Sequence, residues 1–210
     1  MSILKMKTPK FFIKATSTIF VLLVFGFGST PASWAIGGSA DDFIREVGNE
    51  AIQSLTDKSL DDGQRKAKFR EILNRTFKIQ LIARFTLGAN WRRATEEQKK
   101  EYIALFEDFV VMAYAARFRD YSGENFSVGK VRDINARDKL VNSKLMLKDG
   151  SNIPVHWRVR GGEGYKIIDV LVEGVSMALT QRDEFSAIIN RGGGKIEPLL
   201  AALRQKTGRN

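Results

Sequence analysis

The hydrophobic pattern of this chain changes its period near residue 121. Before that point apolar residues recur at helical spacing, as Tyr102, Leu105, Phe106 and Phe109 do. After it they alternate with polar residues, most regularly over residues 153–159. A run of helices, then a run of strands and two final helices predict an α+β fold. We expect a curved antiparallel sheet of about four strands, with helices packed over one face.

Four helices are predicted ahead of the strands. They are expected at about residues 41–56, from an aspartate at 61 or 62, around 79–87, and from residue 95 onward. Thr95-Glu-Glu-Gln98 has the form of a capping box, which satisfies two free N–H groups at a helix start. Gly88 lies where a C-terminal cap is expected. Gly48 should weaken the first helix by about 1 kcal/mol relative to alanine.

Glycines mark the turns of the second half. Asp149-Gly150 is the strongest short hairpin signal in the chain. A glycine-rich turn at 161–164 leads into the last long strand, which ends at a Glu173-Gly174 turn. Thr180 is expected to cap the helix that follows a short apolar run. Three glycines at 192–194 then separate two C-terminal helices.

The first 35 residues have the three parts of a secretory signal peptide. Four lysines and no acid accompany an apolar run at 18–27, and Ser33-Trp34-Ala35 supplies a small-x-small cleavage site. A membrane span needs about 20 apolar residues, and glycine and proline interrupt this run earlier. We therefore expect a cleaved leader, residues 1–35, and a single exported domain, residues 36–210. Because the chain has no cysteine, neither a lipoprotein anchor nor a disulfide can form.

The charge of the chain is strongly basic. The formal net charge is +10, or about +6 once the four lysines of the leader are removed. This charge is compatible with nucleic-acid binding, but an exported protein rarely meets nucleic acid. The predicted second helix carries Arg65, Lys66, Lys68 and Arg70 together with acids, which favours a solvated face. Weak attraction to anionic lipid surfaces is the functional alternative.

Few residues could carry catalysis. His156 is the only histidine, so a metal site built from several His or Cys ligands is excluded. Alternation places it on the outer face of its strand, where we expect an ordinary surface histidine. The glycine runs do not match a phosphate-binding loop. Asp169 is either a structural carboxylate, paired with an arginine or accepting backbone N–H bonds, or a general base in a pocket. We favour the structural role.

Several segments of the chain form a more specific pattern. They are Asp169-Val-Leu-Val-Glu-Gly-Val-Ser176, then Arg182-Asp-Glu-Phe185, and upstream Arg84-Phe-Thr-Leu-Gly88 with Trp91, Tyr121-Ser-Gly-Glu124, Ile153-Pro-Val155 with Trp157-Arg158, and Leu199-Leu200. Together they resemble the MlaC family of periplasmic phospholipid carriers. Gln181, where an aromatic residue is usual, and Tyr165, where a tryptophan is common, depart from the family pattern.

The resemblance implies a non-catalytic, periplasmic protein without cofactor or metal. Such a protein carries diacyl phospholipids between an outer-membrane lipoprotein complex and an inner-membrane ABC transporter with an MCE-domain protein. A related group linked to hopanoid synthesis shares much of the pattern, so a hopanoid or sterol-like carrier is the nearest alternative. The predicted sheet and helices also resemble the cone-shaped NTF2-like folds. An NTF2-like enzyme that uses Asp169 is therefore the third hypothesis.

A lipid carrier needs an apolar cavity. Each buried CH₂ contributes about 0.8 kcal/mol, so two acyl chains in water cost on the order of 20 kcal/mol. We expect the long helix to face the sheet and to line this cavity together with it. The predicted lining is Phe106, Phe109, Val110, Tyr114, Val141, Leu145, Val155, Trp157, Val170 and Val172. Without the resemblance, the simpler prediction is that these residues pack against one another as an ordinary core.

Overall fold

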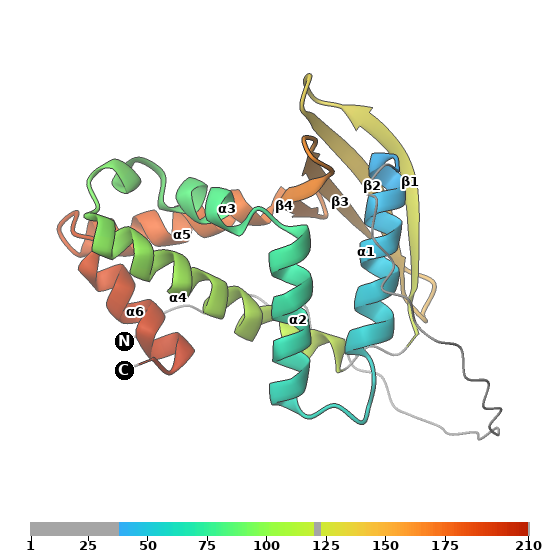
Figure 1. Cartoon of the computed structure of the whole chain (residues 1–210), viewed down its shortest axis with the longest axis horizontal. Helices are drawn as coiled ribbons and strands as arrows, with labels where there is room; N and C mark the ends of the chain where they lie inside the picture. The colour runs from blue at the N-terminus through green and yellow to red at the C-terminus, as the bar shows by residue number, and fades with distance from the viewer. Residues whose placement is uncertain (1–37, 120–122, 210) are drawn as a thin grey trace. The chain divides into compact units, whose positions relative to one another are not determined.

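Six α-helices and five strands make up the described part of the chain (Figure 1). The structure is a computed structural model that describes residues 38–119 and 123–209. The helices are α1 (Ala40–Leu55), α2 (Asp62–Thr76), α3 (Ile79–Leu87), α4 (Glu96–Tyr114), α5 (Met177–Arg191) and α6 (Glu197–Thr207). Short 3-10 segments, Gly88–Arg92 and Ala115–Phe118, follow α3 and α4. The strands are β1 (Asn125–Asp133), β2 (Asp138–Met146), β3 (Asn152–Arg160), β4 (Lys166–Val172) and β5 (Val175–Ser176).

The first helices begin and end at the capping residues that the local sequence predicts. Asp61 and Thr95 each form a complete capping box, with Gln64 and Gln98 respectively. Residue 61, and not residue 62, is therefore the cap of α2. Gly88 ends α3 with a φ of 59°, a conformation that favours glycine. These features depend only on neighbours in the sequence.

The prediction that Thr180 caps α5 is wrong. Ser176 is the N-cap, and its hydroxyl accepts a hydrogen bond from the backbone N–H of Leu179 at 3.0 Å. Thr180 lies inside the first turn and donates to the Ser176 carbonyl at 2.9 Å. Because β5 contains only two residues, the apolar run from Met177 is already helical.

The sheet is an antiparallel meander in the order β1-β2-β3-β4-β5. The two-residue β5 is additional to the four strands predicted. β2 and β3 meet at the predicted Asp149-Gly150 turn, where Gly150 has a φ of 83°. β4 and β5 meet at Glu173-Gly174, whose φ values of 52° and 82° are both positive. A two-residue hairpin turn of this kind matches the twist of the strands.

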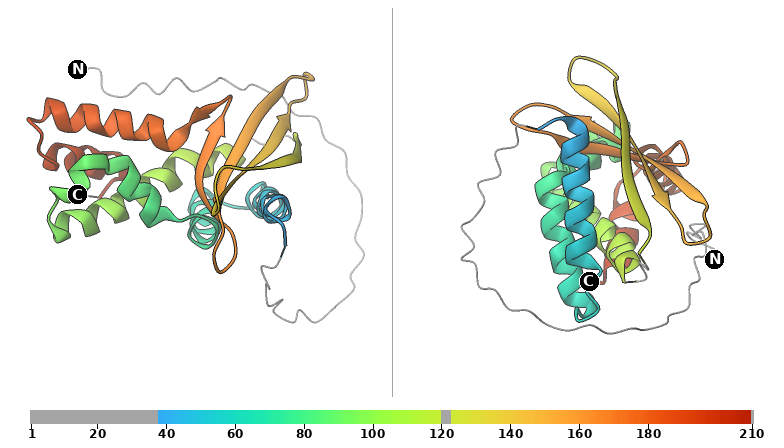
Figure 2. Two further views of the ribbon diagram at one scale, coloured as in Figure 1. Left: turned by 90° about the horizontal axis from the view of Figure 1, so that it is seen from above. Right: turned by 90° about the vertical axis from the view of Figure 1, so that its right-hand side faces the viewer.

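Helix α1 lies against one face of the sheet, over β1 and β2 (Figures 1 and 2). We name the buried residues at this contact the sheet cluster: Ala40, Phe43, Ile44, Val47, Val141, Val159 and Ile167. Gly48 permits a close approach, because a Cβ atom there would lie 2.4 Å from the ring of Phe126. The glycine that lowers the helix propensity of α1 therefore allows the helix to pack closely against the sheet.

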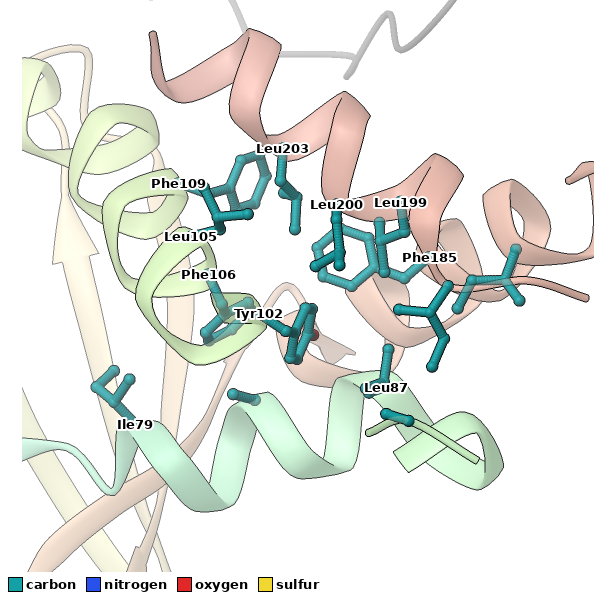
Figure 3. Packing of buried hydrophobic residues seen from close by; sticks show 14 of the residues in the cluster. Ile79, Leu87, Tyr102, Leu105, Phe106, Phe109, Phe185, Leu199, Leu200 and Leu203 are labelled. Atoms are coloured by element: carbon teal, nitrogen blue, oxygen red, sulfur yellow. The ribbon is translucent and has the colours of Figure 1, made fainter. Parts of the chain in front are cut away.

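Helices α3 to α6 pack on one another in a second cluster, to which α2 contributes Leu73 (Figure 3). We name its buried residues the helical cluster: Leu73, Ile79, Ala83, Leu87, Ala94, Tyr102, Leu105, Phe106, Phe109, Val111, Ala115, Phe185, Ile189, Ile196, Leu199, Leu200 and Leu203. The rings of Tyr102, Phe106 and Phe109 lie 6.0, 6.3 and 6.1 Å from the ring of Phe185 on α5. The Tyr102 hydroxyl is hydrogen-bonded to the Thr86 hydroxyl at 2.7 Å. This arrangement corrects the prediction that the apolar stripe of α4 faces the sheet: the stripe faces other helices.

Arg65 also departs from the sequence prediction, which placed it on a solvated face. Its side chain is buried, with an exposed fraction of 2%. The guanidinium donates to the carbonyls of Leu55, Asp57 and Leu60, at the end of α1 and in the loop after it. The Leu55 carbonyl lies in the last turn of α1, where carbonyls have no partner within the helix, so Arg65 satisfies it and ties the end of α1 to α2.

The predicted signal peptide and Tyr121 lie outside the described residues. All described elements belong to one compact unit, residues 36–210. None of the helices in the ranges 38–119 and 123–209 is long and apolar enough to cross a membrane. The leader, its cleavage site and the division of the chain at residue 35 stay predictions.

Candidate functional site

Six of the ten predicted lining residues lie on one face of the sheet. They are Val141, Leu145, Val155, Trp157, Val170 and Val172. The strand register aligns Val141 with Trp157, and Trp157 with Val170. It also aligns Val155 with Val172 on the neighbouring strand. Because Val141 packs against α1, this is the face that α1 partly covers.

Helix α1 buries only part of this face. Val141 is fully buried, and Trp157 is half-buried at the edge of the sheet cluster. Leu145, Val155 and Val172 are half-buried and lie outside the sheet cluster. We name these three residues, with Ile153 beside Leu145 in the register, the open strip. The open strip is apolar sheet surface that solvent still partly reaches.

A serine on the same face does not interrupt its apolar character. Ser143 has an exposed fraction of 2%. Its hydroxyl donates to the Val155 carbonyl at 2.6 Å and accepts from Nε1 of Trp157 at 2.9 Å. An unpaired buried hydroxyl costs about 1–3 kcal/mol, and this one is paired. The face therefore behaves as a continuous apolar surface.

The other four predicted residues lie on α4. Phe106 and Phe109 are buried in the helical cluster, and Val110 packs against that cluster. Tyr114 is half-buried at the end of α4, and burial raises the pKa of its hydroxyl. The structure thus divides the predicted lining into two sets, one in the helical cluster and one on the sheet. A role of the α4 set in lipid binding stays a prediction.

Sequence reasoning left several residues of this face out of the predicted lining. Ile153 and Val159 share it by the alternation of β3, and Phe126 of β1 lies edge-on to the Trp157 ring at 6.3 Å. Alternation was a sufficient signal for β3. It fails for Ile167, because the pairing of β3 with β4 shifts by one residue and turns Ile167 toward α1.

Asp169 has the structural role that the sequence favoured. One carboxylate oxygen accepts from the backbone N–H groups of Val170 and Ala178, at 2.9 and 3.1 Å. The other accepts from the Ser176 hydroxyl at 2.6 Å. The carboxylate thereby links β4 to the first turn of α5. Both of its oxygens are engaged by the protein, which leaves the general-base hypothesis without support in the geometry.

His156 lies on the face of β3 opposite to α1, as the alternation predicts, but it is half-buried and not fully exposed. Within the described part of the chain its Nδ1 atom is buried and has no hydrogen-bond partner. The described residues contain no group of three or more His, Cys, Asp or Glu side chains that could hold a metal ion. The open strip beside α1 is the apolar surface on the sheet that could receive a ligand.

A curated relative and a solved structure are similar to this chain. The toluene tolerance protein ttg2D of Pseudomonas putida is 24% identical over 111 residues, which are 52% of this chain and 51% of that protein. The alignment therefore spans about half of the relative's length. A phospholipid-binding protein from Ralstonia solanacearum, solved at 1.53 Å in complex with a phospholipid, has a TM-score of 0.74 and 16% identity. That match covers 82% of this chain and 98% of the other, and it shows a shared fold.

The broadest comparison is with a protein family. The family described as MlaC protein matches residues 45–205, which include α2 to α5, the whole sheet and most of α6. This range contains the motifs around Arg84, Trp157 and Asp169 that suggested the resemblance. The chain therefore belongs to the MlaC family.

Proposed function

We propose that this protein is a soluble, non-catalytic carrier of diacyl phospholipids in the periplasm. The open strip is the observation on which the proposal depends, because it is apolar surface that the protein leaves incompletely covered. Membership of the MlaC family supports the proposal. So does the shared fold with a Ralstonia solanacearum protein that was solved with a bound phospholipid.

The acyl chains lie along the open strip and extend under α1. Phe43, Ile44 and Val47 of α1 occupy this space against the sheet, so α1 moves outward when the lipid enters. Arg65 holds the C-terminal end of α1 through the carbonyls around Leu55. The movement is therefore largest at the other end of the helix, near Ala40. Lipid chains then replace α1 as the apolar partner of the sheet, which keeps the face out of water.

The carrier exchanges lipid with two membrane complexes. These are an outer-membrane lipoprotein complex and an inner-membrane ABC transporter with an MCE-domain protein, as the family membership suggests. A phospholipid left in water exposes two acyl chains at a cost on the order of 20 kcal/mol. A protein that shields them lowers the barrier to movement between membranes.

A charge on the open strip tests the proposal. We expect Leu145→Glu and Val155→Glu to abolish the retention of diacyl phospholipid, measured by native mass spectrometry of the purified protein. A carboxylate at either position disfavours an acyl chain next to it. Both sites are half-exposed, so the variants are expected to fold, which circular dichroism checks.

The matched control is Ser127→Glu. Ser127 is exposed and pairs with Lys144 on the opposite face of the sheet, so this variant adds the same charge away from the strip. It is expected to retain lipid like the wild type. Full lipid loading of both open-strip variants would contradict the proposed site. Recovery of a hopanoid in place of a phospholipid would favour the related hopanoid carriers.

A further inference from the structure

A cavity lies at one end of the sheet, apart from the open strip. It has a volume of about 520 Å³ and is formed by the β1–β2 turn, the β3–β4 turn and the start of α3. Its lining residues are Lys78, Ala136, Arg137, Lys139, Arg160, Gly161, Gly162 and Tyr165. We name it the basic cavity, because the lining contains four cationic side chains and no acidic one.

Two of the four cations already have an acidic partner. Arg160 binds Asp138 through two hydrogen bonds of 2.6 and 2.9 Å, and Lys139 forms an ion pair with Asp133. The Arg160 pair satisfies the buried Asp138 carboxylate, which Arg158 also contacts at 2.9 Å. These two positive charges are therefore largely compensated within the protein.

The side chains of Lys78 and Arg137 carry the uncompensated charge. Within residues 38–119 and 123–209, neither side chain forms a hydrogen bond or an ion pair. Glu163, in the β3–β4 turn, is exposed and does not line the cavity. Lys78 is half-buried, where an unpaired cation is less well hydrated than at the open surface. The basic cavity thus has the charge to receive an anion.

The basic cavity adjoins the apolar face of the sheet. Lys139 aligns with Val159 in the register and precedes Val141 by two positions, so it lies on the same face as the sheet cluster. The Tyr165 ring lies 6.2 Å from the ring of Phe43 on α1. An anionic group in the cavity would therefore stand at the end of the surface on which acyl chains are proposed to lie.

We propose that the basic cavity binds a phosphate group, held by Lys78 and Arg137. A guanidinium can donate two parallel hydrogen bonds to phosphate oxygens, and an ammonium adds a compact positive charge. If the phosphate is that of a lipid headgroup, the inference rests on the proposed function and explains how the carrier orients its lipid. Free inorganic phosphate offers the same chemistry, so the experiment separates the two sources.

The test compares wild type with the double variant Lys78→Gln/Arg137→Gln. The matched control is Lys130→Gln/Lys148→Gln, which removes the same charge at two exposed positions outside the cavity. Delipidated protein is incubated with vesicles that contain equal amounts of phosphatidylglycerol and diacylglycerol, and the bound lipids are quantified by mass spectrometry. Binding of inorganic phosphate is measured in parallel by calorimetry. Thermal unfolding confirms that each variant is folded.

We expect wild type and control to prefer phosphatidylglycerol by about tenfold or more, since a charge-assisted hydrogen bond contributes enough for that ratio. The double variant should lose most of this preference, which identifies the lipid headgroup as the source of the phosphate.

The other outcomes are distinct. If the double variant loses phosphate binding but keeps the wild-type ratio of phosphatidylglycerol to diacylglycerol, the cavity binds free phosphate. Equal lipid ratios and equal phosphate binding in all three proteins would overturn the inference. If wild type takes up neither lipid, the proposed function fails, and the phosphate measurement alone decides whether the cavity binds an anion.

Discussion

The helical cluster and the apolar face of the sheet contain similar residues but use them differently. In the helical cluster Tyr102, Phe106 and Phe109 surround Phe185, and all four rings are buried. On the sheet, α1 buries part of the face and leaves the open strip half-exposed. Apolar area that is already buried stabilises the fold, whereas area that stays accessible can bind a ligand. The helical cluster is therefore expected to determine stability, whereas the open strip is the surface proposed to bind the ligand.

The largest expected effect is in the helical cluster. We expect Phe185→Ala to lower the free energy of unfolding by about 3–5 kcal/mol, because it leaves a cavity among three aromatic rings. Val172→Ala on the open strip should cost less than about 1 kcal/mol, because that side chain is only half-buried. Chemical denaturation measures both. Similar losses for the two variants would remove the distinction between the regions.

A smaller effect is expected at the polar end of the sheet. Arg160 beside the buried Asp138 holds the pKa of that carboxyl well below its usual range, and Arg158 acts in the same direction. Breaking a buried ion pair costs about 3–5 kcal/mol, and we expect about 2 kcal/mol for Asp138→Asn because the arginines are about one-third exposed.

The pH dependence of the Asp138 effect follows from the direction of its pKa. A carboxyl whose pKa is lower in the folded state stabilises the protein above its unfolded pKa, near 4, and loses this contribution as the pH falls toward the folded pKa. Unfolding at pH 7 should therefore separate wild type from Asp138→Asn more widely than unfolding at pH 3. An equal difference at both pH values would mean that the carboxylate charge is not responsible.

The smallest expected effect concerns the packing of α1 against the sheet. Alanine at position 48 gains about 1 kcal/mol of helix propensity but meets the Phe126 ring, and such overpacking costs about 1–3 kcal/mol. We expect Gly48→Ala to lower the free energy of unfolding by about 1 kcal/mol and to speed lipid uptake from vesicles. Gln53→Ala, an exposed change on the same helix, is the control and should change neither. Unchanged uptake in Gly48→Ala would indicate that α1 does not limit entry.

Local features of this fold were predictable from short stretches of sequence. The helix cap at Asp61, the capping box at Thr95, the Asp149-Gly150 hairpin and the Glu173-Gly174 turn all occur where they were expected. Each depends on backbone conformations and hydrogen bonds among residues within a few positions of one another. The strand alternation likewise placed Val155 and Trp157 on one face.

Partners in space were not predictable in the same way. The period of α4 shows that Phe106 and Phe109 are buried, but it does not show whether a sheet or another helix covers them. Arg65 has the composition of a surface residue, and only the fold brings the carbonyls around Leu55 within its reach. The open strip exists because α1 covers only part of the sheet face, which includes Val141 but not Val155 or Val172.

Residue order alone was thus enough to indicate the class of fold, most of its turns and its family, because these depend on local geometry and on motifs that are read along the chain. The tertiary structure decided which apolar residues cover one another and which remain open. Burial depends on contacts between residues far apart in the sequence, such as Phe43 with Tyr165 and Phe106 with Phe185, and the hydrophobic pattern of one segment contains no information about its partner.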